Sequence, residues 1–294
     1  SINQPTLSPS LPNIAKMMRT QYDTHFRGKW HISKGGMVNV HPEKSLMAAE
    51  VAVYGFKGWT PPDAGENVAI ENCGGGYASH DATYIEQTAQ FLREYQRKQK
   101  RGQADEPFFL ITSLVNPHEE LTYPLTYQDA GYTEADEVLF ENGIDLPATV
   151  HENLRANLKP TAQQLSIPAL ANGLGPLPTD EDKQNYLNFY AYLQKYVDQQ
   201  IYDLLRFFYD ENEQPTDLGK ETIIIRLADH GELGMTHGGL RQKAYNVYEE
   251  TMRVPYIISN PVLFAEAKET DELASLVAIV PTLAGLINGF ACQA

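Results

Sequence analysis

The sequence is poor in cysteine, in basic residues and in long apolar runs. Its two cysteines, Cys73 and Cys292, do not make a disulfide framework. The 23 lysines and arginines face 38 acidic residues, and the formal net charge of -15 argues against a nucleic-acid partner, which needs a basic patch. No run is long and apolar enough to span a membrane. The glycine run at 74–76 is not a phosphate loop, because no Gly-Lys-Ser/Thr follows it.

The elements that can be recognised predict an α/β fold. At 294 residues with 42% hydrophobic content, the chain can bury a large core. Strands that alternate with helices favour a mostly parallel central sheet with helices on both faces. Strands are expected at 22–28, 107–111, 222–225 and 256–258, and helices at 81–100 with Asp81 as N-cap, near 149–158 and at 182–211.

Chemically useful side chains follow three of the expected strands. The carboxyl ends of parallel strands meet at one edge of a sheet, which is where open α/β sheets place their ligands. Residues far apart in the sequence can therefore converge there. In chain order the candidates are Lys29 and His31, then His118, then Asp229 and His230, with Lys243 after a glycine-rich loop.

These residue types suit a tetrahedral anion held on a metal. Asp229 and His230 offer one oxygen and one nitrogen ligand to a divalent cation, which is half a site. Lys243 is a flexible cation suited to an anionic group on that metal, and a histidine can move a proton. By residue types alone, a surface turn with an incidental Asp-His pair explains the stretch equally well.

The order of residues from 229 to 258 adds a resemblance to a known family. DHGE, then G, HG, K, YEE, RVP and II resemble the second half of type I sulfatases, in the alkaline phosphatase superfamily. The resemblance implies that Asp229 and His230 bind the metal and that Lys243 contacts the sulfate. It favours Ca²⁺ as the metal, with Mn²⁺ and Mg²⁺ as alternatives because a histidine ligand softens the site.

Two earlier blocks resemble the same family. GKWH at 28–31 is similar to the motif in which the lysine, here Lys29, grips a sulfate oxygen, and the histidine, here His31, hydrogen-bonds the nucleophile's hydroxyl. In Pro-His at 117–118, His118 matches a histidine that contacts the sulfate or the leaving-group oxygen. The family usually continues with a proline two residues on, whereas Glu119 and Glu120 follow here.

The nucleophile that the family uses has no counterpart in these residues. The resemblance implies a formylglycine made from Cys or Ser in a C/S-x-P/A-x-R motif, and an early pair of aspartates. Cys73 begins CGGGY, and Cys292 lies at the wrong place relative to the other blocks. We therefore expect the chain to lack an N-terminal nucleophile segment and a C-terminal subdomain, and to be inactive alone. A formylglycine-generating or sulfatase-maturing enzyme would then act on the parent.

The predicted function is metal-dependent, formylglycine-type hydrolysis of a small-molecule or carbohydrate sulfate ester. We expect residues 1–294 to form one partial catalytic domain, with 119–182 as a lid over the active face. A phosphonate monoester or phosphodiester hydrolase of the same superfamily is one alternative, and a non-catalytic anion-binding relative is another. We interpret His237 as a loop-stabilising residue, and we expect Arg253 to pair with Glu249 or Glu250.

Overall fold

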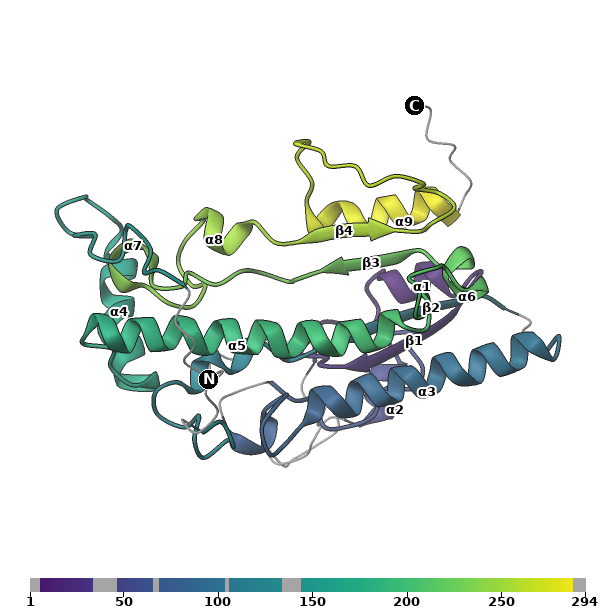
Figure 1. The fold of residues 1–294 in the computed structure, drawn as a ribbon, viewed down its shortest axis with the longest axis horizontal. Helices are drawn as coiled ribbons and strands as arrows, with labels where there is room; N and C mark the ends of the chain where they lie inside the picture. Colours follow the sequence, from purple (N-terminus) through teal and green to yellow (C-terminus); the bar gives the residue numbers. More distant parts are fainter. Residues whose placement is uncertain (1–5, 34–46, 66–68, 104–105, 134–143, 288–294) are drawn as a thin grey trace. The chain divides into compact units, whose positions relative to one another are not determined.

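The computed structural model describes residues 6–33, 47–65, 69–103, 106–133 and 144–287, and Cys292 lies outside them. The chain divides into two compact units (Figure 1). The first unit comprises residues 1–67, 80–115 and 266–294, and the second comprises 68–79 and 116–265. Each unit is described by itself.

The first unit is built on a parallel strand pair. β1 (Asp23–Gly28) pairs with β2 (Phe108–Ser113), with Gly28 opposite Ser113, and α3 (His80–Lys100) packs against both strands. An aromatic core surrounds β1; its buried residues are Ala15, Phe26, Trp30, Val51, Tyr54, Phe56 and Trp59. The remaining helical elements are α1 (Ile14–Met18), α2 (Ala48–Ala52), η4 (Leu276–Ala278) and α9 (Ile279–Ile287).

Asp81 does not cap α3 as predicted. The helix begins one residue earlier, at His80, and the Asp81 side chain is fully buried in the first turn. Its Oδ1 accepts the Val115 N–H at 2.6 Å, just past the end of β2. The carboxylate therefore fixes the chain as it leaves the strand, and the sequence pattern of a cap concealed this long-range contact.

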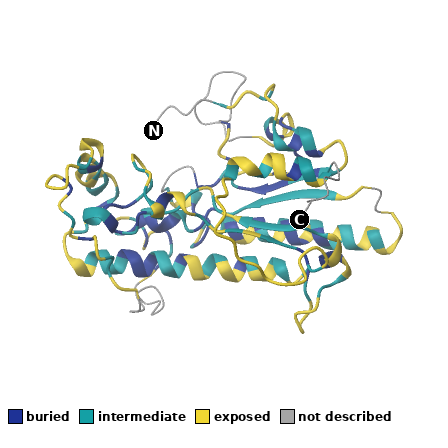
Figure 2. Ribbon diagram, turned by 90° about the horizontal axis from the view of Figure 1, so that it is seen from above, coloured by how far each residue is buried: buried dark blue, intermediate teal, exposed yellow. Residues whose placement is uncertain are grey.

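The second unit combines an antiparallel strand pair with long helices. β3 (Ile224–Leu227) pairs with β4 (Tyr256–Ser259), with Ile224 opposite Ser259. α5 (Asp180–Leu205) begins at a capping box between Thr179 and Asp182. Buried and exposed residues alternate along the helices (Figure 2), and α5 contributes Tyr186, Phe189 and Leu193 to the core of this unit. The other helical elements are η1 (Ile70–Asn72), η2 (His118–Thr122), α4 (Thr161–Leu174), α6 (Asp217–Glu221), α7 (Thr236–Gly239) and α8 (Glu249–Met252).

The structure confirms an α/β protein but corrects its sheet. The described residues form two two-stranded sheets, one parallel and one antiparallel, rather than one mostly parallel sheet. The helix expected near 149–158 is a series of turns, and the helix of this region is α4, which contains Pro168. None of the helices in the described ranges combines the length and the apolar character that a membrane crossing requires.

Candidate active site

Lys29 and His31 follow β1 in the first unit, as predicted. The Lys29 N–H donates to Ser113 O at 2.9 Å, which extends the β1–β2 ladder by one bond. Asp63 then holds the turn, because its carboxylate accepts the Trp30 N–H at 2.7 Å and the His31 N–H at 2.9 Å. His31 has a positive φ of 50° and its side chain is exposed. The turn thus presents a half-buried lysine and an accessible histidine.

Burial raises the pKa of Asp63 above its usual value, against the opposing effect of the two backbone N–H groups and of the His31 and Lys29 charges. Gly65 leaves room for the Lys29 stem. A Cβ at Gly65 would lie 2.7 Å from Val115 Cγ1 and 3.3 Å from the Lys29 Cδ and Cε atoms. Since φ of Gly65 is also +78°, both space and backbone conformation favour glycine there.

Asp229 and His230 leave the end of β3 in the second unit. The Asp229 side chain is 79% exposed, so its oxygens are open to solvent. The His230 N–H donates to Asp229 Oδ1 at 3.0 Å, and His230 Nδ1 lies 2.9 Å from Gly231 O. A carbonyl oxygen can only accept, so Nδ1 carries the proton in this contact. In the neutral ring Nε2 therefore keeps its lone pair, and it lies 3.4 Å from Asp229 Oδ2.

This arrangement fits two ligands of a divalent cation. A carbonyl that fixes one ring nitrogen and leaves the other free is the usual support for a metal-bound histidine. An exposed carboxylate oxygen beside that nitrogen supplies a hard ligand. Within the part of the chain that the structure describes, no group of three or more His, Cys, Asp or Glu side chains is placed to hold a metal ion. Asp229 and His230 thus form half a site, as the residue types predicted.

His118 begins η2, directly after the cis Asn116–Pro117 bond, and is half-buried. Its neighbour Glu119 is buried and binds the glycine run of the same unit. Glu119 Oε1 accepts the Gly74 N–H at 2.9 Å and Oε2 accepts the Gly75 N–H at 3.2 Å. The carboxylates that depart from the family's pattern after His118 therefore have structural partners.

Lys243 follows a loop that begins at Glu232. The Glu232 Oε1 atom accepts the Gln242 N–H at 2.9 Å, and the Leu233 N–H donates to Gln242 O at 3.2 Å. The loop is thus closed on itself, and it brings residue 243 back toward the chain that carries Asp229 and His230. Burial raises the pKa of Glu232, although hydrogen bonds and the Lys243 charge oppose that rise.

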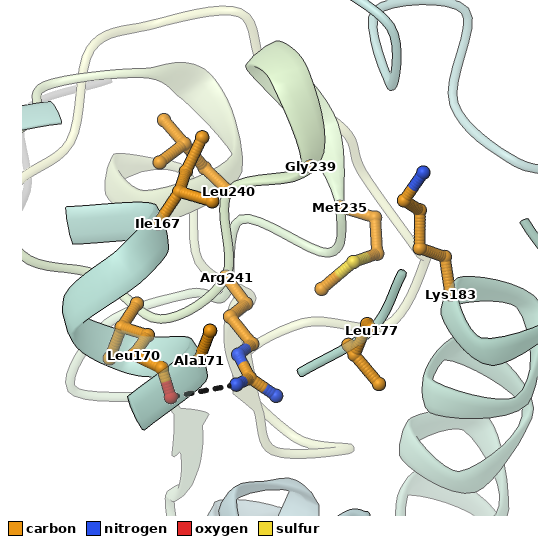
Figure 3. Close-up of a pocket in the computed structure, with 9 residues that line it drawn as sticks. All are labelled: Ile167, Leu170, Ala171, Leu177, Lys183, Met235, Gly239, Leu240 and Arg241. Atoms are coloured by element: carbon orange, nitrogen blue, oxygen red, sulfur yellow. Dashed lines mark hydrogen bonds between the residues drawn. The ribbon is translucent and has the colours of Figure 1, made fainter. Parts of the chain in front are cut away.

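Arg241 anchors the same loop from below (Figure 3). Its guanidinium donates to Leu170 O at 3.0 Å, to Tyr123 O at 3.4 Å and to Gly175 O. A cavity of about 50 Å³ lies beside it; this is room for one or two waters rather than a substrate. The cavity is lined by Ile167, Leu170, Ala171, Leu177, Lys183, Met235, Gly239, Leu240 and Arg241. Arg241 therefore serves the packing of this loop.

His237 has the contacts of a loop-stabilising residue. Its Nδ1 lies 2.9 Å from Glu152 Oε2, its Nε2 lies 3.6 Å from Glu250 Oε2, and its ring stacks on Tyr248 at 3.7 Å. The ion pair expected for Arg253 is absent from the described residues: Glu250 faces His237, and Arg253 bonds Glu249 only through its main-chain N–H, at 2.8 Å.

Hydrogen bonds connect three of the predicted stretches within the second unit. Glu120, two residues after His118, and Glu232, two residues after His230, both bind Gln242, the neighbour of Lys243. Lys29 and His31 belong to the first unit, so their convergence with the others stays a prediction. The sequence interpretation missed the supporting residues Asp63, Glu119, Glu232 and Gln242. The proline pair before Asp63 and the two glutamates after His118 were the available signals.

The chain is thus an α/β protein whose candidate ligands and cations follow its strands. The family model described as Sulfatase matches residues 2–290. The chain is 27% identical over 190 residues to an uncharacterized sulfatase, YidJ, of Escherichia coli K12, covering 65% of the chain and 33% of that protein. It is 25% identical over 183 residues to a Delta 4,5-hexuronate-2-O-sulfatase of Bacteroides thetaiotaomicron, covering 62% of the chain and 36% of that protein.

A solved structure shares the fold. A 2-O GAG sulfatase superposes with a TM-score of 0.64 at 20% identity, covering 98% of this chain and 55% of that one. The chain belongs to the sulfatase family. It spans about a third of the length of the two curated relatives and about half of the solved structure.

Proposed function

We propose that the protein hydrolyses sulfate esters. The observation that carries the proposal is the loop from 229 to 243, in a chain of the sulfatase family. At its start His230 is held so that Nε2 offers a lone pair beside an exposed carboxylate. At its end Lys243 is fixed by a neighbour that is bonded on both its main-chain groups. A cation and a cation-binding pair on one closed loop suit a doubly charged tetrahedral group.

The residues divide the work by chemistry. Lys243, and Lys29 from the first unit, neutralise sulfate oxygens as charge develops on them in the transition state. His31 is exposed on a turn held by Asp63, so its ring is free to give or take a proton. His118 is assigned to the leaving-group oxygen.

Asp229 and His230 would hold the divalent cation, for which calcium is the proposed ion. When bound, such an ion polarises the ester and neutralises negative charge. The nucleophile assigned to the reaction is a formylglycine, for which the 294 residues contain no C/S-x-P/A-x-R motif. The maturation enzyme that would form it is part of the proposal.

The proposed substrate class is a sulfated carbohydrate. One relative is named a Delta 4,5-hexuronate-2-O-sulfatase and a structure of the same fold is a 2-O GAG sulfatase. We therefore place a 2-O-sulfated hexuronate first among the substrates to be tested. A simple aryl sulfate serves as the unspecific comparator.

The test uses the protein expressed from its full open reading frame. Sulfate release is measured from an aryl sulfate and from a 2-O-sulfated unsaturated hexuronate disaccharide, with an aryl phosphonate ester in parallel. Lys243→Ala should lower kcat/KM for the sulfate esters by about 100-fold, the usual effect of removing one transition-state donor. Lys220→Ala is the matched control, since Lys220 pairs only with Asp217 on the surface.

The outcomes separate the alternatives. Faster cleavage of the phosphonate than of either sulfate would assign the protein to the phosphonate and phosphodiester hydrolases. Binding of sulfate without turnover of any ester, despite a modifiable Cys or Ser in the reading frame, would assign it to the non-catalytic relatives. Either result refutes the proposal.

A further inference from the structure

The two residues that precede Lys243 are held on all sides. Arg241 is buried and its guanidinium is bound by three main-chain carbonyl oxygens, so it has no freedom to turn. Gln242 has a φ of 71°, in the left-handed region that few non-glycine residues adopt. A residue adopts this conformation in a folded protein only when its surroundings impose it.

Three hydrogen bonds impose the conformation of Gln242. Its N–H donates to Glu232 Oε1 at 2.9 Å, its C=O accepts from the Leu233 N–H at 3.2 Å, and its Nε2 donates to Glu120 Oε1 at 3.1 Å. The main chain and the side chain of Gln242 are thus both bound. Nothing comparable constrains Lys243 itself, whose amine has no ion-pair partner within 4.0 Å among the described residues.

The two carboxylates are placed where they are costly. Glu120 is 7% exposed, and its Oε2 has no hydrogen-bond partner among the described residues. Glu232 shares its Oε1 with the Tyr186 hydroxyl at 2.7 Å and the Gly234 N–H at 3.3 Å. Burial raises the pKa of Glu120, the charge of Glu232 raises it further, and the Lys243 charge opposes both. Buried carboxylates in this position require a return, and their common partner is Gln242.

We infer that Glu120, Glu232 and Gln242 are positioning residues for Lys243. The two carboxylates hold Gln242 in its left-handed conformation, and this conformation sets the direction in which the chain presents the lysine. The inference deepens the proposed function and rests on it for the role of Lys243. If the clamp is removed, Gln242 relaxes to a negative φ and the lysine samples other directions.

The clamp can be tested without catalysis, by competitive amine labelling of the folded protein and mass spectrometry. Gln242→Ala and Glu120→Ala should each change the labelling rate of Lys243 relative to Lys220 by about tenfold, the ratio for losing one hydrogen bond to a charged group. Glu120→Gln should restore the wild-type rate, because its amide oxygen still accepts from Gln242. Glu213→Ala is the matched control, since Glu213 also has a positive φ but lies on an exposed turn.

Unchanged labelling of Lys243 in both Gln242→Ala and Glu120→Ala overturns the inference. An equal change in Glu120→Gln also overturns it, since that variant keeps the hydrogen bond. A variant that unfolds would raise labelling at every lysine, and Lys220 detects this. In that case Gln242→Asn, which tolerates a positive φ but is too short to reach Glu120, replaces it and should shift Lys243 alone.

A double-mutant cycle tests the link to catalysis in the protein from the full open reading frame. Gln242→Ala should lower kcat for a sulfate ester by about tenfold, again one hydrogen bond. It should cause no further loss in a Lys243→Ala background, because its effect acts through the lysine. Independent, multiplicative losses would show a general structural role and overturn the inference. If wild type releases no sulfate, the proposed function fails, and the labelling still decides the clamp.

Discussion

Replacing Glu119 should release the glycine run at 74–75 from the rest of the second unit. The Glu119 side chain is 2% exposed and its two oxygens accept the Gly74 and Gly75 N–H groups at 2.9 and 3.2 Å. The Tyr132 hydroxyl donates to Oε2 at 3.1 Å. Since Glu119→Ala removes every one of these acceptors and puts no polar atom in their place, three buried donors lose their partner.

The expected magnitude follows from the bonds. A hydrogen bond to a charged group contributes about 1.5–3 kcal/mol. Two backbone bonds, less the cost of burying the charge, leave a loss of about 3 kcal/mol in Glu119→Ala. At about 1.4 kcal/mol per factor of ten, the amides of Gly74 and Gly75 should then exchange about 100-fold faster. Glu119→Gln keeps one acceptor and should lie between wild type and Glu119→Ala.

Native-state hydrogen exchange of the segment that contains Gly74 and Gly75 is the assay. Glu211→Ala is the control, because Glu211 is an exposed glutamate of the same unit and surface changes stay within about 0.5 kcal/mol. Exchange in Glu119→Ala within threefold of wild type would refute the reasoning. Equal exchange in Glu119→Gln and Glu119→Ala would show that packing, not the hydrogen bonds, protects the segment.

Three further predictions concern the same unit. Gly231→Ala should lower the free energy of unfolding by about 2 kcal/mol, because its Cβ would lie 2.0 Å from a main-chain oxygen of α8, and urea unfolding measures this. Hydrogen bonds from Asn157 and then His237 lower the pKa of Glu152 to about 2, so its contribution to stability is full above about pH 4.5 and is lost as pH falls toward 2; acid unfolding of Glu152→Gln should lack that loss. Calcium at about 100 times its Kd should add about 2.7 kcal/mol to the unfolding free energy, and Asp229→Ala should abolish the gain in thermal unfolding.

Each of these has a matched comparison. Gly173→Ala lies in α4, where an added Cβ meets nothing within 4 Å, and should be neutral or stabilising. If Gly231→Ala behaves in the same way, the close approach at α8 is unimportant. Parallel acid unfolding of wild type and Glu152→Gln would remove Glu152 from the explanation. A calcium gain that survives in both Asp229→Ala and His230→Ala would place the ion elsewhere.

Local patterns predicted the elements that depend on local signals. The strands that became β1, β2, β3 and β4 were expected within two residues of their bounds, and so was the start of α5. Pairing depends on contacts between distant segments, and the antiparallel union of β3 with β4 replaced the expected parallel sheet. α4 was missed because Pro160 and Pro168 are typical helix breakers, yet the first lies at its N-cap and the second inside it.

The supporting residues of the candidate site were missed for a related reason. Asp63, Glu119 and Glu232 bind main-chain N–H groups, which every residue but proline carries, so no pattern of side chains marks the partner. Asp63 reaches residues 32 and 33 positions away, and Glu120 reaches Gln242 across 122 positions. The strand ends could be proposed from residue types and the family resemblance, whereas the groups that orient them depend on the fold.

The two glutamates after His118 show how a departure from a family motif can be accommodated. η2 is a 3₁₀ helix, in which successive side chains diverge by about 120°, so adjacent carboxylates face different partners. Glu119 binds the glycine run at 74–75, and Glu120 binds Gln242. A proline fixes only its own stretch of backbone, whereas these side chains tie η2 to two other segments. Because one of those ties ends beside Lys243, the departure adds a connection between His118 and the lysine that the motif does not reveal.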